Sequence, residues 1–321
     1  MTQFHVLVPD NVDQAALDIL QSAGDITVTA PGKMSRAETL AAIGDADALI
    51  IRSATKADAE LLNAANKLKI IARAGVGVDN VDLDTATLKG IAVVNTPGGN
   101  TVSTAEHAFG LMLALARHIP QAHISMNEGK WDRKTFMGNE LRGAILGIVG
   151  FGRIGRALAK RAQAFEMTVV AHDPYIALDI AEDFGVELIS LDNLFSRSDY
   201  ISLHSLVTDE TRHMINAESI ARMKYGVRIV NAARGALIDE AALAAAIQSG
   251  QVAGAALDVY DPEPPASDNP LLSLPGVVHT PHLAASTDQA QVAVAVEAAE
   301  LVIQALKKGD FQNVVNPNAL G

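Results

Sequence analysis

The chain has 321 residues, of which 49% are hydrophobic and 19% charged, so we expect a globular protein of two domains rather than a disordered one. A net charge of -12 argues against a general nucleic-acid or anionic-membrane binder, although a local basic cluster would still suit a small anionic substrate. Cysteine is absent, which excludes disulfides and thiolate chemistry and is typical of a reducing compartment. We see neither a secretion signal nor an uncharged apolar span of about 18 residues, so we expect a soluble, cytoplasmic protein.

Short β-branched runs alternate with helical patterns in the first hundred residues. Five runs have the character of buried strands: HVLV (5–8), ITVT (26–29), ALII (48–51), IIAR (70–73) and IAVVN (91–95). Helical patterns occupy residues 14–22, 37–43 and 57–65 between them. This alternation predicts a parallel sheet with helices on its faces, a first α/β unit over residues 1–98.

A long helix and a second alternating region follow TPGGN (96–100). Ser103 and Glu106 have the spacing of a capping box, which predicts a helix that starts there, runs to Arg117 and is closed by Pro120. Alternation resumes at Ile145, and the later strand candidates are TVVAH (168–172), YISLH (200–204), VRIVN (227–231), GAALDV (254–259) and VVHT (277–280). The second region therefore predicts a dinucleotide-type sheet of about six strands.

LGIVGFGRIGRALAKRAQAF (146–165) predicts a buried strand, a tight turn and a helix. Gly150, Gly152 and Gly155 have the G-x-G-x-x-G spacing that lets a backbone approach a pyrophosphate. Arg153 and Ile154 would lie beside that pyrophosphate, in the first turn of the helix, where N–H groups favour anions.

Asp173 ends the next predicted strand, 18 residues after Gly155. A carboxylate at this distance binds the adenosine ribose in dinucleotide folds. Asp173 could instead be a turn former before Pro174, but the surrounding pattern favours the ribose role. A carboxylate there repels a 2′-phosphate, and DPYIAL contains no Arg or Lys, so we predict NAD rather than NADP.

The last helical pattern, from about Ser286 to Lys308, has no later strand to cover. We infer that it packs back on the first unit. The predicted fold is therefore α/β with two doubly wound parallel-sheet domains. An NAD-binding Rossmann domain (99–284) is inserted into a discontinuous, flavodoxin-like substrate-binding domain (1–98 and 285–321), with the active site expected in the cleft between them.

Arg234, Glu263 and His282 each come just after a predicted strand, where a parallel sheet presents side chains to a ligand. Taken singly, they could be a surface arginine, a loop carboxylate and a structural histidine. Taken together, they suit hydride transfer from a 2-hydroxy acid to NAD: His282 as the base, Arg234 for the substrate carboxylate, and Glu263 to fix the histidine tautomer and raise its pKa.

NAARGALIDE, AALDVYDPEPP and TPHLAASTDQAQ resemble the D-2-hydroxyacid dehydrogenases. RSATK, RAGVGVDNVD, NTPGGN and GKWDRKTFMG are similar to the family's D-3-phosphoglycerate dehydrogenase members, and the resemblance covers nearly the whole chain. It implies oxidation of 3-phospho-D-glycerate to 3-phosphohydroxypyruvate, the first step of serine biosynthesis, by a homodimer or homotetramer. By the same resemblance, Arg234, Glu263 and His282 match the family's catalytic residues.

The resemblance also implies further cofactor contacts, at Ser205, Ala232, Ala233, Asp258 and His282. Asp258 and Ala233 would face the nicotinamide. Two positions of the implied cofactor site depart from the family pattern. Ala284 stands where the family commonly has glycine, and Val76 stands where some relatives have threonine.

A phosphorylated substrate needs positive charge, for which Arg52, Arg73 and Arg133 are candidates. Each alone could be a solvated surface cation, but Arg52 and Arg73 both end predicted parallel strands. The resemblance assigns all three to the phosphate, with Arg133 reaching a neighbouring subunit. Gly75 and Gly77 lie in a loop whose backbone N–H groups could bind the substrate carboxylate.

Other classes of function have less support in the sequence. His279 and His282 are three residues apart, but Pro281 between them and the lack of a third ligand argue against a metal site. The cations around Trp131 lack the interleaved aromatics of a nucleic-acid surface. A hydroxypyruvate or glyoxylate reductase and an NAD-sensing, corepressor-like binding protein remain as alternatives. The end NVVNPNALG leaves no room for a regulatory domain, so we expect no serine-binding site of that kind.

Overall fold

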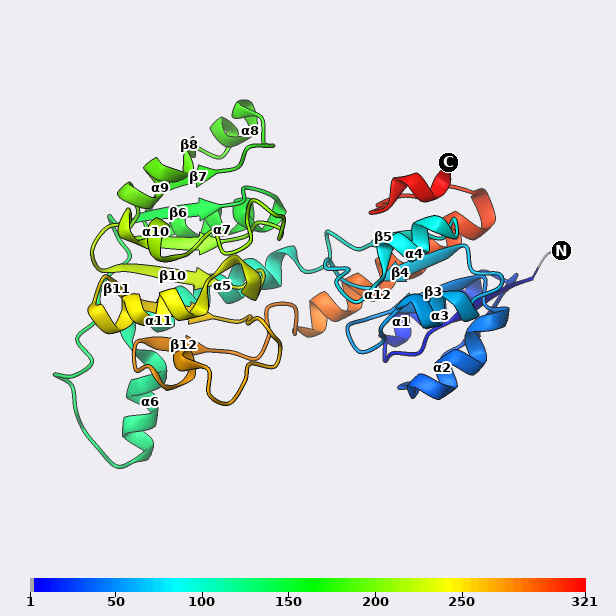
Figure 1. The fold of residues 1–321 in the computed structure, drawn as a ribbon, viewed down its shortest axis with the longest axis horizontal. Helices are drawn as coiled ribbons and strands as arrows, with labels where there is room; N and C mark the ends of the chain where they lie inside the picture. Colours follow the sequence, from blue (N-terminus) through cyan, green and yellow to red (C-terminus); the bar gives the residue numbers. More distant parts are fainter. Residues whose placement is uncertain (1–2) are drawn as a thin grey trace. The chain divides into compact units, whose positions relative to one another are not determined.

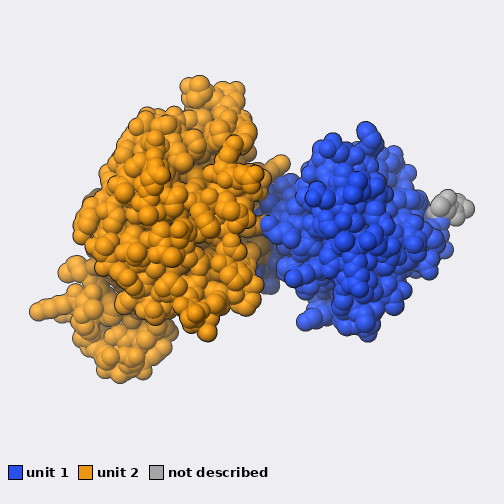
Figure 2. Space-filling view, viewed as in Figure 1, with its two compact units in different colours: residues 1–100, 286–321 blue, residues 101–285 orange. Residues whose placement is uncertain are grey.

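The computed structural model describes residues 3–321. The chain forms two compact units, which Figure 2 shows in different colours. Unit 1 combines residues up to 100 with residues 286–321, and unit 2 comprises residues 101–285. Each unit has its own parallel sheet, covered by helices on both faces (Figure 1).

The sheet of unit 1 has five parallel strands in the order β2-β1-β3-β4-β5, which is the flavodoxin-like order. The strands are β1 (Phe4–Leu7), β2 (Ile26–Thr29), β3 (Ala48–Ile51), β4 (Ile70–Arg73) and β5 (Ala92–Asn95). Ile51 pairs with Arg73, and Arg73 pairs with Asn95. These three strands therefore end together, and the polar residues that follow them share one edge of the sheet.

Helices cover both faces of this sheet because alternate strand residues point to opposite sides. The helices of unit 1 are α1 (Gln14–Ser22), α2 (Arg36–Ala42), α3 (Ala59–Ala64), α4 (Leu83–Leu88) and α12 (Asp288–Lys308), with short 3-10 turns η1 (Ile43–Asp45) and η4 (Pro317–Leu320). Helices α1 and α12 pack on the face that carries Val6 and Ile50, whereas α3 and α4 pack on the face that carries Leu7 and Ile51.

Helix α12 returns the end of the chain to unit 1. Thr287 caps its start, since the side chain accepts a hydrogen bond from the Ala290 amide, and Gly309 ends it with φ +67. Among the described residues, α12 is the one helix that is long and apolar enough to cross a membrane by length and composition alone. A single helix of this kind is weak evidence for a membrane span, because a helix in the core of a globular domain passes the same test.

The sheet of unit 2 has seven parallel strands in the order β12-β11-β10-β9-β6-β7-β8. They are β6 (Ile145–Val149), β7 (Thr168–His172), β8 (Glu187–Leu188), β9 (Tyr200–Leu203), β10 (Val227–Asn231), β11 (Val252–Leu257) and β12 (Val277–His279). The sequence predicted about six; β8 was missed because two residues at a sheet edge carry no recognisable pattern. The strand order reverses where β6 pairs with β9, which is the usual place for a ligand in an open parallel sheet.

Unit 2 has seven helices, most of which pack on the two faces of its sheet (Figure 1). They are α5 (Thr101–Arg117), α6 (Ile119–Asn127), α7 (Arg153–Ala164), α8 (Leu178–Asp183), α9 (Leu191–Arg197), α10 (Ala217–Ala221) and α11 (Glu240–Ser249), with 3-10 turns η2 (Gly235–Leu237) and η3 (Pro270–Ser273). Helices α5 and α7 pack on one face and α9, α10 and α11 on the other. The predicted class of two doubly wound parallel-sheet domains is thereby confirmed.

Two local predictions about α5 are wrong. The helix begins at Thr101, so Ser103 lies within it, and Glu106 forms an ion pair with Arg161 of α7 at 2.8 Å rather than closing a capping box. Pro120 does not close α5 but lies in the first turn of α6, and the break falls at His118, whose φ is 52. Proline is tolerated in a first turn, where its missing N–H would have no helical partner.

Candidate active site

In the glycine turn after β6, backbone atoms pack so closely that two of the glycines have no room for a side chain. A Cβ on Gly155 would lie 2.3 Å from the carbonyl oxygen of Gly150, and one on Gly150, which has φ +92, would lie 2.7 Å from the carbonyl carbon of His204. Gly152 caps α7 without any side-chain hydrogen bond, and nothing lies within 4 Å of its ideal Cβ position. The first amides of α7 are therefore open to an anion, as a pyrophosphate site requires.

The two residues that follow this turn differ in exposure. Arg153, the first residue of α7, is exposed. Ile154 is partly buried and its side chain packs on the core of unit 2. A contact of Ile154 with a cofactor phosphate would therefore involve its backbone amide.

Asp173 follows β7 directly and lies beside the glycine turn. Its Oδ2 accepts a hydrogen bond from the Phe151 amide at 2.8 Å, and its Oδ1 accepts one from the Tyr175 amide at 2.9 Å. The turn role that the sequence left open is thus present, together with a carboxylate held against the glycine turn. Each oxygen retains a further acceptor position, which suits the diol of a ribose.

Two segments after β9 and β10 are held by buried polar groups that the sequence analysis did not single out. The His204 imidazole, whose Nε2 lies 2.8 Å from Ser202 Oγ, has its pKa lowered to about 4 by burial, so it is neutral near pH 7. Ser205 follows it, with its hydroxyl 3.8 Å from the Met214 sulfur. Asn231 is completely buried; its Oδ1 accepts the Ala233 amide at 3.1 Å and its Nδ2 donates to the Arg234 carbonyl at 2.8 Å. Asn231 thereby fixes the loop that contains Ala232, Ala233 and Arg234.

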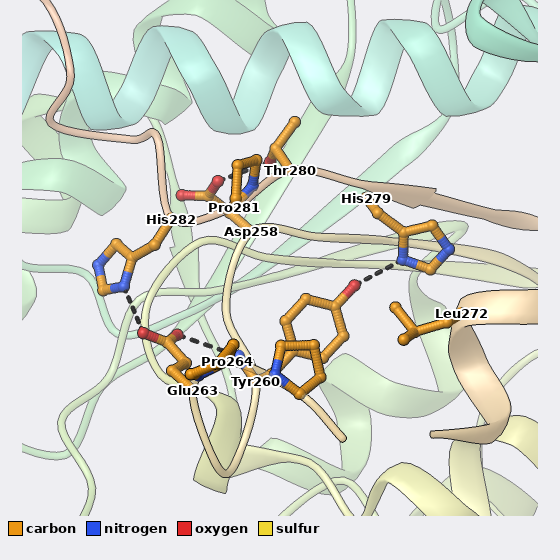
Figure 3. Close-up of a pocket in the computed structure, with 10 residues that line it drawn as sticks. Asp258, Tyr260, Glu263, Pro264, Leu272, His279, Thr280, Pro281 and His282 are labelled. Carbon is orange, nitrogen blue, oxygen red and sulfur yellow. Dashed lines mark hydrogen bonds and ion pairs between the residues drawn. The ribbon is translucent and has the colours of Figure 1, made fainter. Parts of the chain in front are cut away.

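Glu263 and His282 form a hydrogen-bonded pair, with His282 Nδ1 2.8 Å from Glu263 Oε2 (Figure 3). The other carboxylate oxygen accepts the Tyr260 amide at 3.1 Å. The bond to Glu263 raises the pKa of His282 above its ordinary value, and this outweighs the opposing effect of burial. Burial, the largest single effect, would raise the pKa of Glu263, but the hydrogen bond and charge of His282, the Tyr260 amide and the charge of Arg234 together outweigh burial and lower that pKa. An imidazole poised in this way, with Nε2 directed away from the carboxylate, suits proton transfer.

Asp258 lies behind this pair and is fully buried. Its carboxylate accepts four hydrogen bonds: from the amides of Leu283 at 2.7 Å and Ala284 at 2.9 Å, from the Thr280 hydroxyl at 2.6 Å, and from His107 Nε2 at 3.1 Å. Burial would raise the pKa of Asp258, but the hydrogen bonds from His107, Thr280 and the two amides lower it, so it is ionised near pH 7. The sequence offered no sign of His107, which lies 151 residues from Asp258 along the chain.

Arg234 comes just before η2, with its Nη1 donating to the Ala233 carbonyl at 2.7 Å. Gly235 packs so closely against Tyr260 that a Cβ would lie 2.0 Å from the Tyr260 carbonyl carbon. The positive charge of Arg234 contributes to the pKa values of both Glu263 and His282. The three residues predicted to be catalytic are therefore close together at the carboxyl ends of β10, β11 and β12.

A pocket of about 460 Å³ adjoins the Glu263–His282 pair and is lined largely by apolar groups, including Pro264, Leu272 and Pro281 (Figure 3). At its far end, the Tyr260 hydroxyl lies 2.5 Å from His279 Nδ1. Burial lowers the pKa of His279. His279 and His282 therefore each bond a different partner, and no three His, Asp or Glu side chains in residues 3–321 are grouped to hold a metal ion.

The candidate phosphate residues Arg52 and Arg73 lie at the carboxyl edge of the sheet of unit 1. The Arg52 amide donates to Asp10 Oδ2 at 2.6 Å, and its Nη1 donates to the Asn11 carbonyl at 3.0 Å, at the rim of a cavity of about 190 Å³. Arg73 Nη1 donates to the Ala74 carbonyl at 3.1 Å, and its guanidinium lies where a side chain on Gly75 would be.

The loop after Arg73 is anchored by the next strand. The Gly75 amide donates to Thr96 Oγ1 at 2.7 Å, and Asn95 Nδ2 donates to the Val76 carbonyl at 2.7 Å. Gly75, Val76 and Gly77 therefore belong to unit 1. Arg133 instead lies in an exposed segment of unit 2 between α6 and β6.

Comparisons with known proteins agree on one family. Residues 109–284 match the model of the D-isomer specific 2-hydroxyacid dehydrogenase, NAD binding domain. The chain is 51% identical over 311 residues to the D-3-phosphoglycerate dehydrogenase of Archaeoglobus fulgidus, covering 97% of this chain and 59% of that relative. It therefore spans about three fifths of the length of that curated relative.

Solved structures share the fold over the whole chain. The TT0316 protein of Thermus thermophilus has a TM-score of 0.88 and 37% identity, covering 97% of this chain and 100% of that chain. A glyoxylate reductase from Paecilomyes thermophila has a TM-score of 0.89 and 33% identity, covering 99% of both chains. The chain belongs to the D-isomer specific 2-hydroxyacid dehydrogenases, and residues 109–284 are the NAD binding domain of that family.

Proposed function

We propose that this chain oxidises 3-phospho-D-glycerate to 3-phosphohydroxypyruvate with NAD. The observation that carries the chemistry is the hydrogen-bonded pair of Glu263 and His282, placed at strand ends beside Arg234. The substrate choice is supported by curated relatives named D-3-phosphoglycerate dehydrogenase, at 51% identity in Archaeoglobus fulgidus, and by the two arginines on the edge of unit 1.

His282 acts as the base that removes the proton from the substrate 2-hydroxyl. Its Nδ1 is bonded to Glu263, so Nε2 is the ring nitrogen left to face the substrate. Glu263 stabilises the imidazolium that forms, which is why the pKa of His282 is raised. In the reverse direction, protonated His282 returns the proton to the carbonyl oxygen.

Arg234 binds the substrate carboxylate or carbonyl oxygen. A guanidinium offers donors in a planar fork that matches a carboxylate. Asn231 and Gly235 hold the backbone on either side of Arg234, so its position is set by buried contacts rather than by the substrate. We propose that Arg52, Arg73 and Arg133, with the backbone at Gly75 and Gly77, bind the phosphate end and the substrate carboxylate.

The residues around β6 and β7 are suited to NAD. The uncapped start of α7 and the open space at Gly152 would take the pyrophosphate, and Asp173 would take the ribose diol. Bound NAD supplies the acceptor for the hydride from C2 of the substrate. Further contacts are proposed at Arg153, Ile154, Ser205, Ala232, Ala233, Asp258, Ala284 and Val76. A carboxylate at position 173 disfavours NADP by repulsion of its 2′-phosphate.

We also propose a cytoplasmic homodimer or homotetramer. The absence of cysteine suits a reducing compartment. The oligomeric state is testable by light scattering of the purified protein.

A second candidate is a glyoxylate or hydroxypyruvate reductase, because a glyoxylate reductase shares this fold over 99% of the chain. The deciding experiment follows NAD reduction at 340 nm with 3-phospho-D-glycerate, D-glycerate and D-lactate. We expect kcat/KM to favour the phosphorylated acid strongly. Equal or higher values for the unphosphorylated acids would overturn the phosphoglycerate assignment and leave a general D-2-hydroxyacid dehydrogenase.

A further inference from the structure

Three polar side chains from distant parts of unit 2 meet behind the acid/base histidine. His107 Nε2, on α5, lies 3.1 Å from Asp258 Oδ1 and 3.1 Å from Thr280 Oγ1. Thr280 Oγ1 lies 2.6 Å from the same Asp258 oxygen. All three atoms are thus within mutual hydrogen-bonding distance.

The hydrogens available to Asp258, Thr280 and His107 determine which ring nitrogen of His107 is protonated. Asp258 is ionised near pH 7 and can only accept, so the single proton of the Thr280 hydroxyl is donated to it. Thr280 can then only accept from His107. His107 Nε2 must therefore carry a hydrogen, shared between Asp258 Oδ1 and Thr280 Oγ1.

Asp258 in turn holds the backbone on both sides of His282. Its carboxylate accepts the amides of Leu283 and Ala284, and its carbonyl oxygen accepts the His282 amide at 2.8 Å. His282 has φ 55, a left-handed conformation that costs free energy for a residue with a side chain and persists only where the surroundings enforce it. The orientation of the imidazole toward Glu263 thus depends on where the Asp258 carboxylate lies.

We infer that His107 is a positioning residue for His282: its Nε2–H fixes the Asp258 carboxylate and Thr280, and these hold the loop that directs His282 toward Glu263. His107 touches neither member of the Glu263–His282 pair and acts only through Asp258 and Thr280. The inference rests on the proposed function of His282 as the acid/base group.

The test compares His107→Leu with His107→Gln, whose amide nitrogen replaces the Nε2 donor. The readout is the pH dependence of kcat/KM, measured with whichever D-2-hydroxy acid the wild-type protein oxidises, so that a wrong substrate assignment does not affect it. The charged groups that act on His282 are Glu263, Asp258 and Arg234. In His107→Leu we expect kcat to fall roughly tenfold and the acid limb to move to lower pH, because the bond from His282 to Glu263 loosens. In His107→Gln the limb should return toward its wild-type position.

His5→Leu provides the matched control, because His5 Nε2 makes a single 2.9 Å bond to a threonine, Thr29, in unit 1. It should lower the melting temperature without moving the acid limb. If His107→Leu does not fold, Thr280→Val removes the hydroxyl that bonds both His107 and Asp258, with almost no change in side-chain volume. An acid limb that stays at the wild-type pH in the folded variant overturns the proposal, as does a His107→Gln limb no closer to wild type than that of His107→Leu.

Discussion

Units 1 and 2 are built on the same plan, yet they hold their functional side chains in different ways. In unit 2, pairs of side chains bond each other: Glu263 bonds His282, and Asp258 accepts from the side chains of Thr280 and His107 in addition to two backbone amides. In unit 1, Arg52 and Arg73 are instead tethered to backbone carbonyls, those of Asn11 and Ala74. Proton transfer depends on short, directed hydrogen bonds, whereas an anion can be held by charge over a wider range of positions.

This contrast predicts that unit 2 is the more sensitive to single changes. Removing the acid/base group should produce the largest effect. We expect His282→Asn to lower kcat, measured at saturating NAD and substrate, roughly 10³-fold, because the hydroxyl proton loses its acceptor. The control His123→Asn, at an exposed histidine of α6, should leave kcat unchanged. A kcat within tenfold of wild type would remove His282 from its proposed role.

The next largest effect should come from unit 1 and depend on the substrate. Arg52→Ala should lower kcat/KM for 3-phospho-D-glycerate roughly 10- to 150-fold, the loss of a charged hydrogen bond of about 1.5–3 kcal/mol. Activity on D-glycerate should hardly change. Lys67→Ala removes the same charge from unit 1, at a lysine paired with Asp45, and should affect neither substrate. A loss of equal size on both substrates would mean that Arg52 does not bind the phosphate.

The preference for NAD over NADP tests the proposed contact of Asp173, in unit 2, with the cofactor ribose. In Asp173→Ser we expect the KM for NAD to rise roughly tenfold, from the loss of a charged hydrogen bond to the ribose, and the ratio of NAD to NADP activity to fall. Initial rates at varied cofactor concentration measure both. Asp179→Ser, at the exposed start of α8, is the comparison variant. An unchanged ratio would leave Asp173 as a turn residue alone.

The smallest expected effect is on the pH dependence of kcat/KM, which tests whether Glu263 raises the pKa of His282. Oxidation needs neutral His282, so kcat/KM rises as pH increases through its pKa. Glu263 raises that pKa, and burial and the charge of Arg234 oppose it. In Glu263→Gln the acid limb should therefore move to lower pH, with kcat on the plateau falling by less than about tenfold.

Glu240→Gln is the control for Glu263→Gln. Glu240, on α11, accepts a 3.0 Å hydrogen bond from the amide of Asp261, which lies two residues before Glu263, but Glu240 does not bond His282. Its acid limb should match that of the wild type. A limb that moves to higher pH in Glu263→Gln would contradict the assigned role of Glu263.

Much of the fold follows from local pattern. The five strands of unit 1 lie within a residue or two of the runs that predict them, because a strand buried on both faces must be a short, continuous apolar segment. The start of α5 could not be located in this way. A capping-box spacing at Ser103 also occurs by chance within a helix, and here Glu106 bonds Arg161 instead.

The sequence by itself determined that Gly150, Gly152 and Gly155 form the turn between β6 and α7, that Asp173 follows β7, and that Arg234, Glu263 and His282 follow strands. Those signals are local, since a glycine spacing or a strand end is set by neighbouring residues. Only the tertiary structure decided that Asp258, Thr280 and His107 meet, because the first two directly follow β11 and β12 and the third lies in α5. Their contacts arise from the order of strands in a sheet and the helix that covers it, and no spacing along the chain encodes that order.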